Sequence, residues 1–560
     1  MALTRRDFLR AGGGALSALA GPLAGCSDDH EPARDDDEVL LDVKFAELSL
    51  AGRTVRVRTY GGAIPGPTIS TAPGKTLTIR VKNQLPFYDS STWNPELTNV
   101  PHHLNTTNLH VHGLEVVPHL FEPVGTADPA AKMIAIGPGT SKTYALELPA
   151  NHPTGLYWYH PHHHGSTSVQ VLNGMAGLIL VKGAIDEVPE IAAAKDYQVA
   201  VQDLGLFEKV DEPGVWMYDP PQNAIWATFT GKSTFNDEDG NPIMDAPSGF
   251  STGDYPLRLF LVNGSPVFEE IHNADMPTQP VGSQLEVPRF TLRPGEVVRF
   301  RVLNGCSDNL IPLMVEQHDM HLIAIDGVNF TAPRLRPYLE NASDQDAQVL
   351  LPSGGRAEFL IQGSDTPGVY AVKQLFQMQQ FLQSAEKVLF EIEVKGEAVS
   401  MALPSVLPTP TRHYPLLDPD KVSVRRTVVF GMVFPPVVNK LVGLDFEMNG
   451  VAYDEGTVDF RPKLGAIEEW TIDDEQMESA GHTGSMEGHP FHLHTNSFEV
   501  ISINGVSVEP GTIQDTVWVP HNQKVVIRVK FEEWAGKDVF HCHILPHEDT
   551  GMMQNLLITA

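Results

Sequence analysis

An internal repeat constrains the fold of this chain more than any other feature of its sequence. The segment Ala72-Pro-Gly-Lys-Thr-Leu-Thr-Ile-Arg-Val-Lys-Asn83 recurs as Arg293-Pro-Gly-Glu-Val-Val-Arg-Phe-Arg-Val-Leu-Asn304, and a looser copy is Lys463-Leu-Gly-Ala-Ile-Glu-Glu-Trp-Thr-Ile-Asp473. Each copy places turn residues before an alternating run, which is the pattern of a β-strand that follows a turn. The copies predict three units of one kind, because a repeated segment marks a repeated structural unit.

The ends of the first and last repeats also match. Tyr157-Trp-Tyr-His160 stands before Asn173-Gly-Met-Ala-Gly-Leu-Ile-Leu180 as Asp538-Val-Phe-His541 stands before Thr550-Gly-Met-Met553. The middle repeat has Gly368-Val-Tyr-Ala-Val372 and none of the histidine motifs. With 47 Gly, 44 Pro and many short alternating runs, the chain is predicted to be all-β and built of sandwiches. We expect units at 40–190, 191–410 and 411–560, called here the first, middle and last thirds.

The charge balance excludes some partners. The formal net charge is −31 at pH 7. Nucleic acids and anionic membrane surfaces attract basic patches, so we expect neither as a partner. An acidic surface favours the approach of cations.

Four histidine clusters in the first and last thirds carry the chemistry. They are His110-Val-His112, His160-Pro-His162, His489-Pro-Phe-His492-Leu-His494, and His541-Cys-His543 followed by His547 and Met552. Neutral imidazole suits copper, and a Cys thiolate with two His and a weak axial Met is the blue-copper set. Cys542, His547 and Met552 supply such a set, with His489 as the second imidazole.

The position of Cys542 between two histidines has a structural meaning. Neighbouring side chains of a strand point to opposite faces. Cys542 can therefore hold one metal while His541 and His543 reach metal on the other face. Such an arrangement joins two metal centres through adjacent residues.

These motifs resemble those of multicopper oxidases, the family of laccases and bacterial copper-efflux oxidases. The resemblance covers nearly everything after residue 40 and implies three cupredoxin-like Greek-key β-sandwich domains with four copper ions per chain. Type 1 copper would take His489, Cys542, His547 and axial Met552, and type 2 copper would take His110 and His492. The type 3 pair would take His112, His160 and His543 on one ion, and His162, His494 and His541 on the other.

The resemblance also implies a reaction. A phenolic, aromatic or metal-ion substrate would lose one electron at a time to type 1 copper, and dioxygen would be reduced to water at the other coppers. The chain is expected to be a monomer. Oxidation of Cu(I) for copper tolerance stays open as an alternative, as does a non-catalytic copper-binding envelope protein, because some relatives keep the fold without copper. A copper nitrite reductase is disfavoured, since it has two domains and no His-Cys-His cluster.

Proton delivery requires acids near the copper cluster. Glu548 directly follows His547 in a string that is similar to the copper-efflux oxidases. Asp128 is the expected acid of the first third, with Glu122 as the alternative, because 117–127 departs from the family pattern. The remaining histidines of the first third have no ligand role in that pattern. We expect His164 to pack beside the ligands, and His102, His103, His119 and His152 to lie in solvent.

The N-terminus predicts a targeting segment at 1–26 and an acidic linker at 27–39. Thr4-Arg-Arg-Asp-Phe-Leu-Arg10 resembles a twin-arginine export signal, which implies a periplasmic or cell-envelope protein. Leu23-Ala-Gly-Cys26 resembles a lipoprotein cleavage box, so Cys26 is a candidate lipid anchor, with an ordinary cleaved signal as the alternative. The third cysteine, Cys306, is expected to be a buried thiol.

The segment 473–487, before His489, is longer and more acidic than is usual in the family. Met477, His482 and Met486 offer soft ligands suited to Cu(I). The alternative is a flexible, solvated loop.

Overall fold

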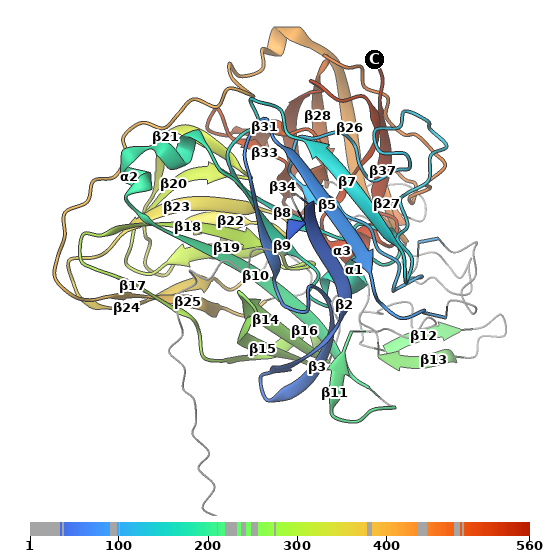
Figure 1. Cartoon of the computed structure of the whole chain (residues 1–560), viewed down its shortest axis with the longest axis horizontal. Coiled ribbons are helices and arrows are strands. Elements are labelled where there is room, and N and C mark those ends of the chain that lie inside the picture. Colours follow the sequence, from blue (N-terminus) through green and yellow to red (C-terminus); the bar gives the residue numbers. More distant parts are fainter. Residues whose placement is uncertain are drawn as a thin grey trace, which may run out of the picture.

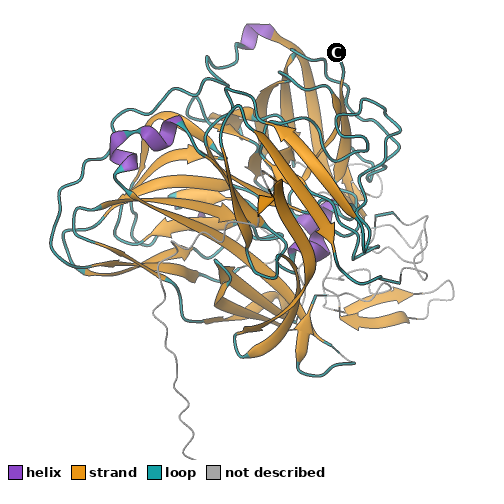
Figure 2. Cartoon of the chain, in the orientation of Figure 1, coloured by secondary structure: helices purple, strands orange, loops and turns teal. Residues whose placement is uncertain are grey.

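The computed structural model describes residues 34–35, 38–89, 98–99, 101–209, 211–218, 232–236, 242–247, 256–273, 276–377, 384–433, 445–474, 482–483 and 487–560. These residues form mainly strands, and the helices among them are short (Figure 2). The all-β prediction is therefore confirmed. No described helix is both long and apolar enough to cross a membrane. The predicted export signal, Cys26, most of the linker, Met477, Met486 and the side chain of His482 lie outside the described residues.

The first third folds as two sheets around one core. One sheet contains β2 (Glu38–Leu50), β3 (Arg53–Tyr60), β5 (Thr76–Asn83) and β7 (Ser141–Glu147). The other contains, in spatial order, β4 (Gly66–Thr71), β9 (Gly177–Val181), β8 (Gly155–His160) and β6 (His110–His112). In β5, Leu77, Ile79 and Val81 are buried and pack in this core. The alternation in the sequence thus provides one apolar face per strand.

The middle third repeats this plan. One sheet contains β10 (Lys195–Glu208), β14 (Leu257–Val262), β15 (Ser265–Asn273), β16 (Met276–Gln284), β18 (Val297–Asn304), β20 (Met320–Ile325), β21 (Val328–Arg336) and β23 (Arg356–Gln362). The other contains β17 (Arg289–Leu292), β25 (Lys387–Val394), β24 (Gly368–Gln374), β19 (Ile311–Val315) and β22 (Val349–Leu351). Through β11 (Val215–Met217), the larger sheets of the first and middle thirds join into one 14-stranded sheet.

The last third has the same two layers. The larger sheet contains β27 (Asp445–Met448), β26 (Val422–Val433), β28 (Ile467–Asp473), β35 (Lys524–Lys530), β31 (Phe498–Ile503) and β32 (Val506–Ser507). The smaller contains β34 (Thr516–Val519), β30 (His489–Leu493), β36 (Gly536–Cys542) and β37 (Met553–Ile558). The remaining elements are β1 (Arg34–Asp35), β12 (Lys232–Asn236), β13 (Pro242–Pro247), β29 (His482–Thr483), β33 (Ile513–Gln514), α1 (Thr167–Val171), α2 (Pro189–Ala192) and α3 (Leu545–Glu548).

The sequence repeat corresponds to one strand in each third. β5, β18 and β28 each pair in parallel with an earlier strand, namely β2, β10 and β26. Each also pairs antiparallel with a later one, namely β7, β23 and β35. The predicted repeat is thus a repeat of structure. The boundaries at 190 and 410 stay predictions.

The first and last thirds meet where α1 contacts α3, near the centre of the molecule (Figure 1). The Lys537 side chain, in β36, adds a second tie between them. Its Nζ donates to the carbonyls of Pro129, Ala131 and Glu455 at 3.0, 2.9 and 2.7 Å. These contacts fix the loop of the first third beside the strand that contains Cys542.

Candidate metal centre

Two neighbouring strands of the last third carry most of the candidate ligands. β30 pairs antiparallel with β36, with Phe491 opposite Cys542 and His492 opposite His541. Because strand side chains alternate, His489 and Cys542 share one face while His492 and His541 share the other. The predicted division of the ligands between two faces follows from this register.

The first third brings its histidines to the second face. β6 pairs antiparallel with β8, and His110 lies opposite His160. The eight imidazoles from both thirds are fully buried and form three groups, of which the first two share His112: His110, His112 and His492; His112, His160 and His543; and His162, His494 and His541. The last two groups have the membership that the resemblance implied for the type 3 pair.

In the group of His162, His494 and His541, lone pairs converge. His541 Nδ1 donates to the Cys542 carbonyl at 2.8 Å, and His494 Nδ1 lies 3.1 Å from Asp538 Oδ1, so both rings carry their proton on Nδ1. Their Nε2 atoms are then acceptors, yet they lie 3.1 Å apart. His162 Nε2 is also 3.1 Å from His541 Nε2. Acceptors this close to one another fit a shared cation.

The group of His112, His160 and His543 has the same character. His160 Nδ1 donates to the Pro161 carbonyl at 2.9 Å, and His160 Nε2 is buried without a hydrogen-bond partner. His543 Nδ1 lies 3.1 Å from Ser353 Oγ, whose own hydrogen goes to the Cys306 carbonyl. His543 Nε2 therefore faces His112 Nδ1 as an acceptor, at 3.3 Å.

His112 differs from the others because its Nδ1 faces inward. Its Nε2 lies 3.0 Å from Asp515 Oδ1, so this nitrogen is the donor and Nδ1 is free to bind metal. His492 Nδ1 donates to the Asp515 carbonyl at 2.8 Å, and its Nε2 lies 3.5 Å from His110 Nε2. One residue, Asp515, thus holds two candidate ligands.

The thiol group lies on the other face. His489 Nδ1 is 3.4 Å and His547 Nδ1 is 4.0 Å from Cys542 Sγ, and Ile544 N donates to the same sulfur at 3.3 Å. Met552 is fully buried in the same core cluster. Phe446 stacks on the His547 ring with centroids 4.0 Å apart. The Nε2 atoms point to carboxylates: Glu487 Oε1 is 3.3 Å from His547, and Asp474 Oδ1 is 3.7 Å from His489.

Burial sets the protonation of these groups. It lowers the pKa of His160 to about 3 and that of His541 to about 4. For His494, burial and neighbouring imidazoles lower the pKa well below its usual value. The rings are therefore neutral, as metal ligands must be. Burial also raises the pKa of the Cys542 thiol, so a thiolate there requires a nearby cation. The donor set fits copper.

Glu548 lies beside the histidine groups. It is fully buried, its Oε1 is 3.5 Å from His162 Nδ1, and its Oε2 has no hydrogen-bond partner. Burial and then Asp549 raise the pKa of Glu548 well above its usual range. Burial also raises the pKa of Asp549 to about 7. With His164, these two acids form a further buried group.

Asp128 is not brought to the histidine groups. It is exposed, and its Oδ1 accepts from Ala130 N at 2.9 Å within its own loop. Glu122 is also exposed and pairs with Lys142 at 2.6 Å. The structure therefore gives neither acid a contact with a candidate ligand among the described residues.

Three histidines expected in solvent are buried, so that prediction was wrong for His102, His119 and His152. Val111 N donates to His119 Nε2 at 3.1 Å, and Glu115 N donates to His152 Nε2 at 3.0 Å. A neutral imidazole that accepts a backbone N–H can be buried at little cost. His103 is half-buried, and His164 packs beside Glu548 and Asp549 as expected.

The sequence motifs did not predict the residues that contact the outward nitrogens of the candidate ligands. Asp515, Ser353 and Asp538 each contact a candidate ligand. Asp515 and Ser353 lie outside the histidine motifs, and Ser353 comes from the middle third. Burial raises the pKa of Asp538 to about 7.

Known proteins are similar to this chain in sequence and in fold. Family models described as multicopper oxidase match residues 96–185, 245–385 and 424–560. Multicopper oxidase mco of Staphylococcus haemolyticus is 26% identical over 514 residues, covering 89% of this chain and 83% of that protein. Cell division protein FtsP of Dickeya dadantii is 23% identical over 581 residues, covering 100% and 99%. The structure of a multicopper oxidase from Campylobacter jejuni, described as a metallo-oxidase, superimposes with a TM-score of 0.65 at 21% identity, covering 94% of this chain and 93% of that one.

Proposed function

The chain belongs to the multicopper oxidase family and is a copper oxidoreductase that uses oxygen, and on that premise we propose which side chains hold copper and what the protein oxidises. His489, Cys542, His547 and Met552 would hold type 1 copper, and His110 and His492 type 2 copper. The type 3 pair would take His112, His160 and His543, and His162, His494 and His541. The protein would hold four coppers and couple oxidation of a phenolic or metal-ion reductant to reduction of dioxygen to water.

The observation that carries this proposal is the convergence of imidazole lone pairs on one face of β36. The Nε2 atoms of His162 and His494 each lie 3.1 Å from His541 Nε2, and the outward nitrogen of each of the three rings faces an oxygen. Neutral imidazoles at this distance repel unless a cation lies between them. Cys542 connects this face to the thiol group through its two neighbours in the chain.

Copper, when bound, supplies one-electron transfer and the reduction of dioxygen, and the chain supplies geometry and protons. Glu548 would donate protons: it is buried beside His162, and burial raises its pKa well above its usual range, which favours the protonated form that a donor needs. Asp128 has less support for this role, because it is exposed and accepts a hydrogen bond from Ala130 N within its own loop.

The edge of the thiol group favours a reductant that brings positive charge or a proton. Glu487 lies 3.3 Å from the outward nitrogen of His547, and its side chain is 13% exposed. A metal cation or a phenolic O–H satisfies a carboxylate there, whereas an anionic substrate is repelled. The net charge of −31 also favours the approach of a cation over that of an anion.

A non-catalytic role in the cell envelope is the second candidate, because a cell division protein is among the relatives. Oxygen uptake by the copper-loaded protein separates the two. We expect uptake with a phenol, with Cu(I), or with both, and four coppers per chain by metal analysis. A copper-loaded protein that consumes no oxygen with either reductant would establish the envelope role instead.

We also propose that the protein is exported by the twin-arginine route and anchored at Cys26. The support is the N-terminal sequence alone. Arg5→Lys with Arg6→Lys should leave the protein in the cytoplasm, since ammonium groups do not replace paired guanidinium groups. Cys26→Ser should release it from membranes. A soluble wild-type protein on fractionation would contradict the lipid anchor but not the export route.

A further inference from the structure

One turn of the middle third lies against the candidate ligands, although that third supplies none. The turn follows β22 and runs through Ser353, Gly354 and Gly355 to Arg356, the first residue of β23. Gly354 has φ +84°, and a Cβ there would stand 2.9 Å from the His543 ring and 3.0 Å from the His112 ring. Any larger residue would push against two candidate ligands. The close fit shows that this turn and the histidine groups share one packed region.

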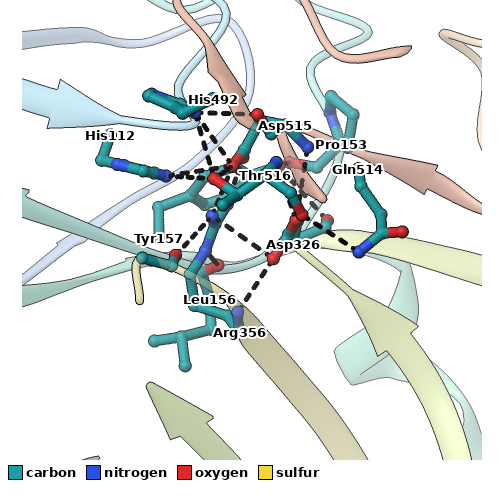
Figure 3. A network of polar contacts seen from close by, with 12 residues as sticks. His112, Pro153, Leu156, Tyr157, Asp326, Arg356, His492, Gln514, Asp515 and Thr516 are labelled. Carbon is teal, nitrogen blue, oxygen red and sulfur yellow. Dashed lines mark hydrogen bonds and ion pairs between the residues drawn. The ribbon is translucent and has the colours of Figure 1, made fainter. Parts of the chain in front are cut away.

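Arg356 extends from this turn to the last third. Its guanidinium is fully buried and pairs in two places with Asp515, from Nη1 to Oδ1 at 2.8 Å and from Nη2 to Oδ2 at 2.6 Å (Figure 3). Its Nη1 also donates to the Gly354 carbonyl at 3.1 Å, and its Nε to the Leu156 carbonyl of the first third at 3.3 Å. A bidentate pair of this kind fixes the plane of the carboxylate.

Asp326 secures the other side of Asp515. Its Oδ1 accepts from Arg356 N at 2.8 Å. Its Oδ2 accepts from Asp515 N at 3.3 Å and from Thr516 N at 3.2 Å. Backbone and side chain of Asp515 are therefore both held by the middle third (Figure 3).

Asp515 transmits this placement to two imidazoles. Its carboxylate accepts a hydrogen bond from His112 Nε2, which leaves His112 Nδ1 as the inward nitrogen. Its carbonyl accepts a hydrogen bond from His492 Nδ1, which leaves His492 Nε2 as the inward nitrogen. A partner on the outward nitrogen fixes both the tautomer and the ring angle of a metal-binding histidine.

We propose that Arg356 and Asp326 of the middle third are positioning residues for copper, acting through Asp515 on His112 and His492. The proposal rests on the copper assignment given above. The middle third would then be a working part of the copper site and not only a spacer between the other two. Ser353, which accepts from His543 at 3.1 Å, extends the same role to a third ligand.

The alternative is that Arg356 only neutralises a buried acid. Arg301 offers a matched control, because it is equally buried in the middle third, in β18, and pairs with Asp186 and Asp196 at 2.6 and 2.8 Å. No contact joins Arg301 to a candidate ligand among the described residues. A purely structural role predicts that Arg356→Lys and Arg301→Lys behave alike.

The test compares these two variants as copper-loaded holoproteins. Arg356→Lys loses the bidentate pair, and we expect it to release copper to a chelator at about 10- to 100-fold lower chelator concentration, the usual effect of losing such a partner. Its type 2 electron paramagnetic resonance signal should change while the blue absorbance of the type 1 site is retained. Arg301→Lys should lower the melting temperature but keep both copper retention and the signal of the wild type.

Equal copper retention and an unchanged type 2 signal in Arg356→Lys would overturn the proposal, as would the same loss in both variants. A wild-type protein without a type 2 signal would instead reject the copper assignment. If Arg356→Lys does not fold, Ser353→Ala and Ser307→Ala give a second pair. Ser307 Oγ is buried without a hydrogen-bond partner, so only the Ser353 variant should release copper more readily. Equal retention in that pair would count against the middle third as a positioning element.

Discussion

The two faces of β36 carry candidate metal-binding groups that are built in opposite ways. On the thiol face, His489, Cys542 and His547 all come from the last third, and aromatic rings and two carboxylates surround them. On the other face, eight imidazoles come from two thirds of the chain, and the remaining third holds several of them from behind. The first group needs one folded unit, whereas the second needs all three. Changes on one face should therefore leave the other intact.

The largest expected effect comes from removing the thiol. Cys542→Ser replaces the soft ligand with a hydroxyl, so the blue band and turnover should both be lost. The fold should survive, because the two side chains are close in size. Visible absorbance and oxygen uptake give the measurement. A blue Cys542→Ser protein would contradict the assignment of the thiol face.

His492→Ala is the matching change on the other face. Among the described residues, the imidazole has polar contacts with His110, Asp515 and Thr516 and none with the thiol group, so the blue band should persist while oxygen reduction is lost. The same two measurements apply. If His492→Ala bleaches the blue colour, then the two faces are not independent and the comparison fails.

Proton supply should have the next largest effect. Glu548→Gln keeps the shape of the side chain but cannot donate a proton, so reoxidation of the reduced enzyme should slow by about 100-fold. Because the pKa of Glu548 is raised, the wild-type rate should fall as pH rises through that raised pKa. Stopped-flow reoxidation at several pH values measures this.

Glu499→Gln is the control for that change. Glu499 is also a buried carboxyl of the last third with a pKa raised by burial, but it lies in β31 of the larger sheet. Its replacement should leave reoxidation unaltered. Equal slowing in both variants, or in neither, would return Glu548 to a structural role.

Acid should destabilise the metal-free protein, mainly through the imidazole face. Burial lowers the pKa of His160 to about 3, whereas the unfolded chain binds that proton near the usual value. Between those values the unfolded state binds more protons, so the free energy of unfolding falls as pH falls below about 6.5. His160→Gln should reduce this slope by about 1.4 kcal/mol per pH unit. Urea unfolding of the metal-free protein at pH 7 and 5.5 tests this, with Met552→Leu as a control that titrates nothing.

The smallest effect is expected at the outer edge of the thiol face. Glu487→Gln removes a charge near His547, so KM for Cu(I) should rise about 3- to 10-fold, as for one partly exposed charge contact. KM for a neutral phenol should change less. Steady-state kinetics with both reductants gives the comparison, and an equal change for both would favour a phenol oxidase.

The division of the candidate ligands between two faces could be predicted from sequence because their spacing encodes strand alternation. His541 and Cys542 point to opposite faces of β36, and pairing with β30 places His492 beside the first and Phe491 beside the second. The three-unit fold was likewise visible, since the repeat has the same strand neighbours in each third. A local sequence pattern is enough to predict the direction of side chains that lie on a single strand.

The supporting residues could not be predicted in this way. Arg356 reaches Asp515 across 159 residues of sequence, and neither residue lies in a motif with histidine. The exposed position of Asp128 was hidden for a related reason, because whether a carboxyl is buried depends on packing between thirds. The burial of His152 was not predicted, because the backbone group that donates to its ring, Glu115 N, lies 37 residues away in the sequence.

The imidazole face is formed by side chains from the first and last thirds together, and this affects how the site forms during synthesis of the chain. His543 follows His112 by 431 residues. At synthesis rates of about 5 to 20 residues per second, His112 waits on the order of 20 to 90 s for its partner. During that interval half of the cluster would exist as free imidazoles on an unfinished chain. Copper present at the ribosome would therefore meet a site that still lacks the histidines of the last third. Only the completed, folded chain encloses the site.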